Sequence, residues 1–262
     1  MDADYRLSRP VDLVQVSARS PAAAARKKGG GHGTGRGHHK PPTFPVPRRS
    51  VVFKQTPRRI GRGQDYDGRL MRFDRGTRCT GQVEGTDTAA VFILEDGATL
   101  RNAVIGANQA EGVHCLGACR IINVWWEDVC EDALTLKGDG NALVYGGGAR
   151  AAEDKIIQHN GLGEVWIEKF SATDFGKLYR SCGNCKRQGR RVVTMKDVVA
   201  IRGKDLIGIN VNYGDVATVL GAATRQVKET CAKFVGNDRG REPVKAPVGS
   251  FPKACSLHGV NV

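Results

Sequence analysis

One pattern recurs along the chain: LRNAV (100–104), IINVW (121–125), IEKFS (167–171) and MKDVV (195–199). Each run holds a polar residue among apolar ones, and alignment of the runs places in register Asn102, Asn123, Lys169 and Asp197. The steps between these positions are 21, 46 and 28 residues, and the middle step is about two turns of 23, with NALVYGGG (141–148) supplying the missing turn. Periods in the twenties are typical of a solenoid, in which each rung buries its face only against its neighbours.

The chain from residue 45 onward has the composition of an all-β domain. Short β-rich runs lie between Gly, Asn and Asp residues, and no long segment has a convincing helical period. A β-sandwich stays open as the alternative on periodicity alone, although its hairpins would be more closely spaced. The pattern therefore predicts a parallel β-helix over residues 45–262.

The N-terminal part of the chain differs in composition. The segment AAAARKKGGGHGTGRGHHKPP (22–42) is basic, rich in Gly and poor in large apolar residues, so it cannot repay its ordering entropy by burial. We predict a disordered, basic, Gly- and His-rich leader over residues 1–44. Of the net charge of +13, residues 1–63 carry +11 and the remaining residues carry +2. Because most of the net charge lies in residues 1–63 and little in the rest of the chain, we expect no nucleic-acid partner.

Membrane and export signals are missing from the sequence as it stands. No run of about 18 or more apolar residues occurs, so we expect no membrane partner. The first residues, MDADYRLSRPVDLVQVSARS (1–20), lack the basic and apolar regions of a secretory signal. The 8 Cys residues would form supporting disulfides in an exported protein. A zinc site stays open as a lesser alternative, with the ligands Cys115, Cys119, Cys182 and Cys185.

Acidic residues recur with the spacing of the rungs. Glu111 lies 20 residues before Glu131 and 21 before Asp132, and Asp154 lies 22 after Asp132. On a solenoid with turns of this length, these carboxylates stack on one side and repel one another unless a cation lies between them. Hard oxygen ligands of this kind suit Ca²⁺. Spacing alone leaves a solvated acidic face as an equal alternative.

Four cations accompany these acids. Lys137 and Lys155 lie among them, and Lys177 and Arg180 follow Lys155 by 22 and 25 residues, on the next turn. The functional interpretation is a cluster of cations that holds an anionic substrate. In such a cluster, positive neighbours lower the pKa of one Lys or Arg, so that this residue can act as a base. The alternative is a set of ordinary surface residues paired with acids.

The same region carries long motifs of unusual composition: AEGVHC (110–115), NVWWEDVCEDALTLKG (123–138), DKIIQHNG (154–161) and DFGKLYRSCGNC (174–185). These motifs resemble the polysaccharide lyase family 3 pectate lyases, and the resemblance covers about residues 44–255. It implies a single-stranded right-handed parallel β-helix. It also implies calcium-dependent β-elimination of de-esterified homogalacturonan (polygalacturonate) to 4,5-unsaturated oligogalacturonides. We accordingly expect a secreted, monomeric protein that degrades pectin in plant cell walls.

The resemblance also assigns roles by position. The acids that match the calcium site are Glu111, Glu131, Asp132 and Asp154. Lys155 matches the catalytic base, which must be neutral to remove the C5 proton, so activity should rise toward alkaline pH. Lys177 and Arg180 match cations that bind the substrate carboxylate and assist catalysis, as Lys155 does, and Lys137 is a further candidate for substrate binding.

Two other functions stay open. A polygalacturonase-like hydrolase would use Glu131 and Asp132 as acid and base, although adjacent residues of a strand point to opposite faces. A non-catalytic or degenerate pectin-binding β-helix would need no base. The presence of Lys155, Lys177 and Arg180 argues against that second alternative.

Overall fold

The computed structural model describes residues 43–82 and 85–261. Almost all regular structure in this part of the chain is β-strand. The elements are β1 (Ser50–Val52), β2 (Arg58–Ile60), β3 (Asp65–Asp74), η1 (Asp87–Ala89), β4 (Ala90–Leu94), β5 (Ala98–Ile105), β6 (Glu111–Cys115), β7 (Cys119–Trp126), β8 (Asp132–Leu136), β9 (Ala142–His159), β10 (Gly163–Glu168), β11 (Ser171–Ser181), β12 (Arg191–Asn210), η2 (Val211–Tyr213), β13 (Val216–Val235), β14 (Val244–Lys245), η3 (Pro252–Ala254) and β15 (Cys255–Asn261).

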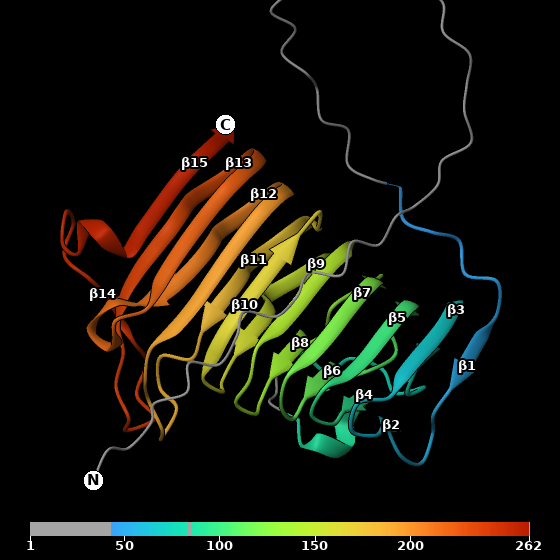
Figure 1. Ribbon diagram of the computed structural model, residues 1–262. Coiled ribbons are helices and arrows are strands. Elements are labelled where there is room, and N and C mark those ends of the chain that lie inside the picture. The colour runs from blue at the N-terminus through green and yellow to red at the C-terminus, as the bar shows by residue number, and fades with distance from the viewer. Residues whose placement is uncertain (1–42, 83–84, 262) are drawn as a thin grey trace, which may run out of the picture. The chain divides into compact units, whose positions relative to one another are not determined.

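The strands stack as the rungs of a parallel β-helix. One row of strands runs β1-β3-β5-β7-β9-β10-β12-β13, and a second row runs β2-β4-β6-β8-β9, as the blue-to-red progression in Figure 1 shows. Every pairing is parallel apart from the short antiparallel contact of β14 with β13. The predicted right-handed parallel β-helix is therefore confirmed, and the β-sandwich is excluded. No helix among the described residues is long and apolar enough to cross a membrane.

The repeated polar residues form a turn ladder. Asn102, Asn123, Lys169 and Asp197 all adopt left-handed backbone conformations, with φ of 51°, 53°, 56° and 52°. Gly146 (φ 66°) fills the position that the 46-residue step left open, so the predicted register is confirmed. Asn is the residue apart from Gly that tolerates this conformation best, because its side chain bonds locally. Here Asn123 Nδ2 donates to Asn102 Oδ1 over 2.9 Å.

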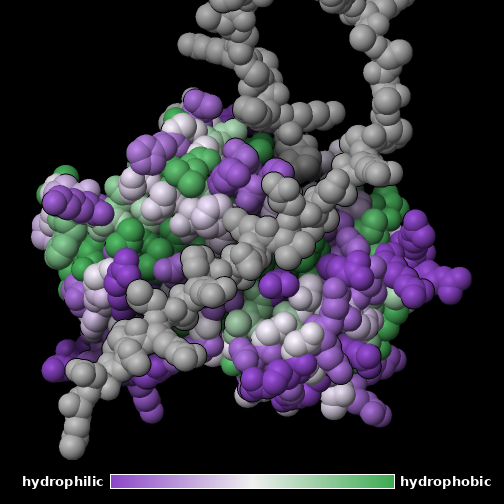
Figure 2. All heavy atoms as spheres, viewed as in Figure 1, coloured by the Kyte–Doolittle hydropathy of each residue, from purple (hydrophilic) through white to green (hydrophobic). Residues whose placement is uncertain are grey.

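The interior consists of apolar side chains stacked in columns. One such column holds a buried residue from each of six successive rungs: Leu100, Ile121, Val144, Ile167, Met195 and Val219. Each rung covers the apolar surface of the next, so the burial that stabilises the fold is shared between neighbours. The face in Figure 2 mixes hydrophilic side chains with small apolar groups.

All 8 Cys residues are paired in the described structure, which has no free cysteine. The disulfides are Cys79–Cys130, Cys115–Cys119, Cys182–Cys185 and Cys231–Cys255. The alternative of a zinc site is therefore wrong, because its four thiols form two of these bonds. The predicted leader falls outside the described residues except for Thr43 and Phe44, and the Phe44 ring lies 4.9 Å from that of Trp125.

The turn ladder leads to a stability prediction. Asn123→Val and Asn123→Gly both remove the side-chain hydrogen bonds, but only valine is strained at positive φ. We expect Asn123→Val to have a free energy of unfolding about 1–2 kcal/mol lower than that of Asn123→Gly. Urea unfolding measures the difference, and equal stabilities would contradict the proposed role of the left-handed turn.

Candidate active site

Strand register places charged residues of successive rungs side by side. Asp132 on β8 is paired with Lys155 on β9, which is paired with Lys177 on β11. Lys177 is in turn paired with Asp205 on β12, and Asp205 with Glu229 on β13. We call these five residues the charged column. Since neighbouring parallel strands lie about 4.8 Å apart, the column brings together predicted residues that are 22 or 23 positions apart in sequence.

A β-bulge interrupts the pairing within the column. Phe175 is paired with Ala152, but Lys177 is paired with Lys155, so two residues of β9 oppose one residue of β11. Asp154 lies in this bulge and bonds to both lysines, 2.8 Å from Lys155 Nζ and 2.6 Å from Lys177 Nζ. Bulges commonly re-aim side chains beside active sites. This one makes Asp154 a bridge between two cations of neighbouring rungs.

The Lys155 ammonium lies among the predicted calcium ligands. It is 3.1 Å from Glu131 Oε1 and 3.4 Å from Asp132 Oδ1, besides its bond to Asp154. Burial alone would lower the pKa of Lys155, but the surrounding carboxylates outweigh burial and raise that pKa. The expectation that cations crowd the base is therefore wrong for Lys155, which is held protonated by acids in this arrangement.

Asp132 is the most constrained acid of the cluster. Its side chain is buried, and burial together with the charges of Glu131 and Glu111 raises its pKa well above 3.8, against the opposing effect of Lys155. Its Oδ1 atom is buried without a hydrogen-bond partner. Within residues 43–82 and 85–261, no three metal-ligating side chains are grouped tightly enough to hold an ion as they stand. The donor set still fits calcium, because its oxygens are hard and Asp132 Oδ1 accepts no hydrogen bond.

Glu111 is engaged by a partner that sequence reasoning missed. His114 is fully buried, and its Nε2 atom lies 3.1 Å from Glu111 Oε2, while the Gly85 N–H donates to Glu111 Oε1 over 2.8 Å. The other ring nitrogen of His114 lies 3.4 Å from Asp87. The i,i+3 spacing of Glu111 and His114 is a weak signal in sequence. In the structure it shows that His114 orients the carboxylate of Glu111.

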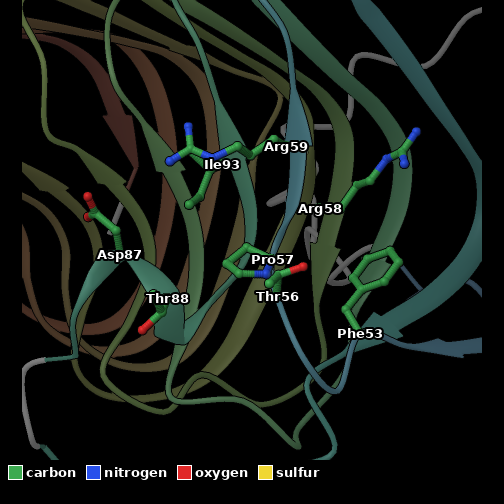
Figure 3. A pocket seen from close by; sticks show the side chains of 8 residues that line it. All are labelled: Phe53, Thr56, Pro57, Arg58, Arg59, Asp87, Thr88 and Ile93. Atoms are coloured by element: carbon green, nitrogen blue, oxygen red, sulfur yellow. The ribbon is translucent and has the colours of Figure 1, made fainter.

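Lys137 lies apart from the other predicted cations. It follows the far end of β8 from Asp132, and its ammonium bonds to Asp87 over 2.9 Å. Asp87 also lines a hollow of about 600 Å³, which Figure 3 shows together with Phe53, Arg58 and Arg59. None of the predicted catalytic, substrate-binding or calcium-binding residues lines this hollow, so it is a poor candidate for the centre of the reaction.

A second hollow lies beside the charged column. Its volume is about 760 Å³, and it spans the turns of β9, β11, β12 and β13. Its lining includes Glu153 and Gly176, which adjoin Asp154 and Lys177, and three cations: Arg202, Lys204 and Lys228. Asp174 also lines the hollow and pairs with Arg202, so three cations face two acids, and the small positive excess favours an anionic ligand.

Arg180 is the cation with the most unusual surroundings. It is only 7% exposed, and its Nη1 atom is buried without a hydrogen-bond partner. No ion pair to Arg180 occurs among the residues that the structure describes. Burial lowers the pKa of its guanidinium to about 10, against the opposing effect of Asp215. A buried, unpaired guanidinium is costly, so it is a strong candidate for a functional group.

The family of the chain follows from comparison with known proteins. A pectate lyase family model matches residues 42–241. The chain belongs to the pectate lyase family. Pectate lyase E of Emericella nidulans is 53% identical over 220 residues, which cover 81% of this chain and 85% of the relative. Probable pectate lyase D of Aspergillus fumigatus is 52% identical over 79% of this chain and 86% of the relative.

Solved pectate lyase structures share the fold. The catalytic domain of pectate lyase PelI from Erwinia chrysanthemi has a TM-score of 0.64 at 30% identity, covering 82% of this chain and 97% of that chain. PelI in complex with tetragalacturonic acid has a TM-score of 0.63 at 30% identity, over 82% of this chain and 70% of that chain. The predicted family is confirmed, and the protein is a pectate lyase enzyme.

The raised pKa of Asp132 has a testable consequence for this pectate lyase. Its carboxyl is harder to ionise in the folded than in the unfolded chain, so ionisation costs stability. The cost is absent below the unfolded pKa near 3.8, grows as the pH rises toward the folded pKa, and is complete above the folded pKa. In chelator at pH 8, Asp132→Asn should therefore raise the melting temperature by roughly 2–4 °C, and at pH 4 by much less.

Asp174→Asn is the matched control. Asp174 is exposed, and its pairing with Arg202 lowers its pKa, so neutralisation at pH 8 should leave the melting temperature unchanged or slightly lower. Thermal melts at the two pH values measure both variants. A destabilised Asp132→Asn at pH 8 would contradict the electrostatic account of the cluster.

Proposed function

We propose that this pectate lyase is calcium-dependent and cleaves polygalacturonate by β-elimination, releasing 4,5-unsaturated oligogalacturonides. The observation that carries the proposal is the juxtaposition of a buried acid cluster with Lys155 and Lys177 in one column. Hydrolysis by Glu131 and Asp132 is disfavoured, because both carboxylates lie against the single ammonium of Lys155 rather than facing across a cleft.

Calcium binding is supported by the chemistry of the donor set. Glu131, Asp132 and Asp154 converge on one cation, the Lys155 ammonium, and the buried Oδ1 atom of Asp132 has only this 3.4 Å ion pair and no hydrogen bond. Glu111 would complete the set from the preceding rung. Calcium bound there would draw electron density from a uronate carboxylate and make the C5 proton more acidic. A calcium ion and the Lys155 ammonium would compete for the same carboxylate oxygens. Calcium binding therefore requires that the lysine side chain move away from these oxygens.

This competition gives Lys155 its role as base. Once the Lys155 ammonium has moved away from the acids, they no longer raise its pKa. Burial then lowers that pKa and favours the neutral amine. A neutral Lys155 removes the C5 proton, and Lys177 and Arg180 hold the carboxylate by charge-assisted hydrogen bonds. Loss of the C4 oxygen then leaves the unsaturated sugar. Since the neutral amine is required, activity should rise toward alkaline pH.

The setting of the reaction is a further part of the proposal. The neighbour PelI was solved with tetragalacturonic acid, and the groove beside the charged column has more cations than acids in its lining, which favours such an anionic chain. The four disulfides fit an oxidising, extracellular environment. We propose a secreted monomer that acts on pectin in plant cell walls.

An ultraviolet assay tests the reaction class. Incubation with polygalacturonate and calcium should give growing absorbance from unsaturated ends, and a chelator should abolish it. Reducing sugar without absorbance would mean hydrolysis, and no product at any alkaline pH would leave binding alone. Absorbance that survives rigorous chelation would contradict the calcium assignment.

Lys155→Ala tests the base and the competition together. It should lower kcat by on the order of 10³ or more, as loss of a general base does. It should also tighten calcium binding in calorimetry, because the competing ammonium is gone. Lys196→Ala, which removes a surface lysine paired with Glu168, should change neither quantity. A Lys155→Ala variant with full rate, beside an inactive Arg180→Lys, would move the base to Arg180.

A further inference from the structure

Arg180 is held by an aromatic ring rather than by an acid. The Arg180 Cζ atom lies 4.1 Å from the centroid of the Phe234 ring. Phe234 is on β13, two rungs beyond Arg180 on β11, and the intervening rung contributes Gly208. A Cβ atom at Gly208 would come within 3.0 Å of Arg180 Cδ and 3.3 Å of the Phe234 ring. The glycine therefore leaves open the path along which the guanidinium reaches the ring.

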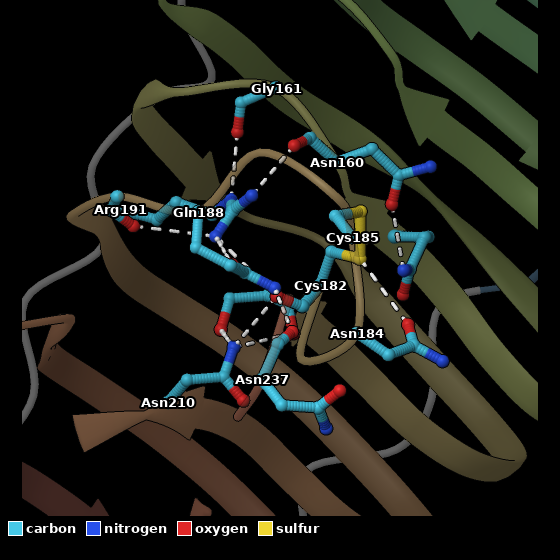
Figure 4. The surroundings of a disulfide bond; sticks show 12 residues. Asn160, Gly161, Cys182, Asn184, Cys185, Gln188, Arg191, Asn210 and Asn237 are labelled. Carbon is cyan, nitrogen blue, oxygen red and sulfur yellow. Dashed lines mark hydrogen bonds between the residues drawn. A yellow bond between two sulfur atoms is a disulfide. The ribbon is translucent and has the colours of Figure 1, made fainter. Parts of the chain in front are cut away.

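The other side of the guanidinium is closed by the loop after β11. A Cβ atom at Gly183 would lie 2.7 Å from Arg180 Nη2, so this loop packs directly on the cation. The Cys182–Cys185 disulfide closes the loop, and Asn210 Nδ2 donates to Cys182 O over 3.0 Å, as Figure 4 shows. The guanidinium is thus enclosed between a ring and a braced loop.

Arg191 shows what a structural arginine looks like in the same region. It is fully buried, and its guanidinium donates to Gly161 O over 2.8 Å and to Asn160 O over 2.7 Å, with further bonds to Gln188 (Figure 4). The N–H donors of Arg191 are therefore hydrogen-bonded to acceptors within the protein. The Arg180 donors are not, since a ring contacts the face of a guanidinium and leaves the in-plane N–H groups free.

We propose that Phe234 is a positioning residue for Arg180: its stacked ring fixes the guanidinium without using the N–H donors, so that no protein acceptor in the described part of the chain competes with a uronate carboxylate for them. An acid at the same place would fix the cation as well, but it would occupy those donors. The inference rests on the proposed role of Arg180 in binding substrate. In this role Phe234 supports the reaction from a rung two steps away and contacts no reacting atom itself.

Phe234→Leu tests the inference, because it keeps apolar volume and removes the ring. We expect kcat/KM for polygalacturonate to fall about tenfold, the range of a lost cation–π contact, while Phe234→Tyr keeps the rate. Phe234→Met replaces the leucine variant if that variant does not fold. Phe53→Leu is the matched control: Phe53 is also half-buried, packs on Phe73 at 5.7 Å, and should change stability alone.

A double-mutant cycle separates positioning from structure. In an Arg180→Gln background, adding Phe234→Leu should lower kcat/KM by less than a further twofold, because the ring acts through the arginine. An equal tenfold loss in both backgrounds, or an unchanged kcat/KM for Phe234→Leu, would overturn the role of Phe234. Full activity of Arg180→Gln itself would instead overturn the proposed role of Arg180, so the two failures are distinguishable.

Discussion

Backbone pairing between successive rungs is the constraint on which the rest of the structure depends. In a parallel β-helix, a one-residue slip would move every side chain of a rung to the other face. The left-handed residues of the turn ladder prevent such a slip at one corner of each rung, where Asn102, Asn123 and Gly146 lie one above another. The apolar columns and the charged column share this single register. Folding and the assembly of the site are therefore one event.

Several residues of the site, in the charged column and at Arg180, hold charge in surroundings that disfavour it. Asp132 is buried with a raised pKa, and the acids around it hold Lys155 protonated. Arg180 is buried without an ion-pair partner among the described residues, and burial lowers its pKa. Charges kept in such surroundings cost stability unless a ligand satisfies them. A divalent cation and a uronate carboxylate are ligands of the required signs, so we regard this strain as the physical basis of the proposed activity.

Much of this arrangement was predictable from sequence, because period and residue type are local properties. The alignment of Asn102 with Asn123 and the 22-residue step from Lys155 to Lys177 follow directly from strand register. The bulge at Asp154 was not predictable, since one extra residue on a rung leaves no mark in composition. The acid surroundings of Lys155 and the contact of Phe234 with Arg180 also escaped prediction, because both depend on which side chains meet across rungs. Lys137 follows the end of β8 opposite Asp132 and bonds to Asp87, so its part in substrate binding stays a prediction.

The central claim is that the acids and cations of neighbouring rungs form one site for calcium and a uronate chain. A crystal structure of the Lys155→Ala protein with calcium and tetragalacturonate tests it most directly. The account predicts an ion bound by Glu111, Glu131, Asp132 and Asp154, a uronate carboxylate against that ion, and Arg180 donating to the carboxylate while stacked on Phe234. A sugar chain bound elsewhere, or an ion that avoids these acids, would contradict the account.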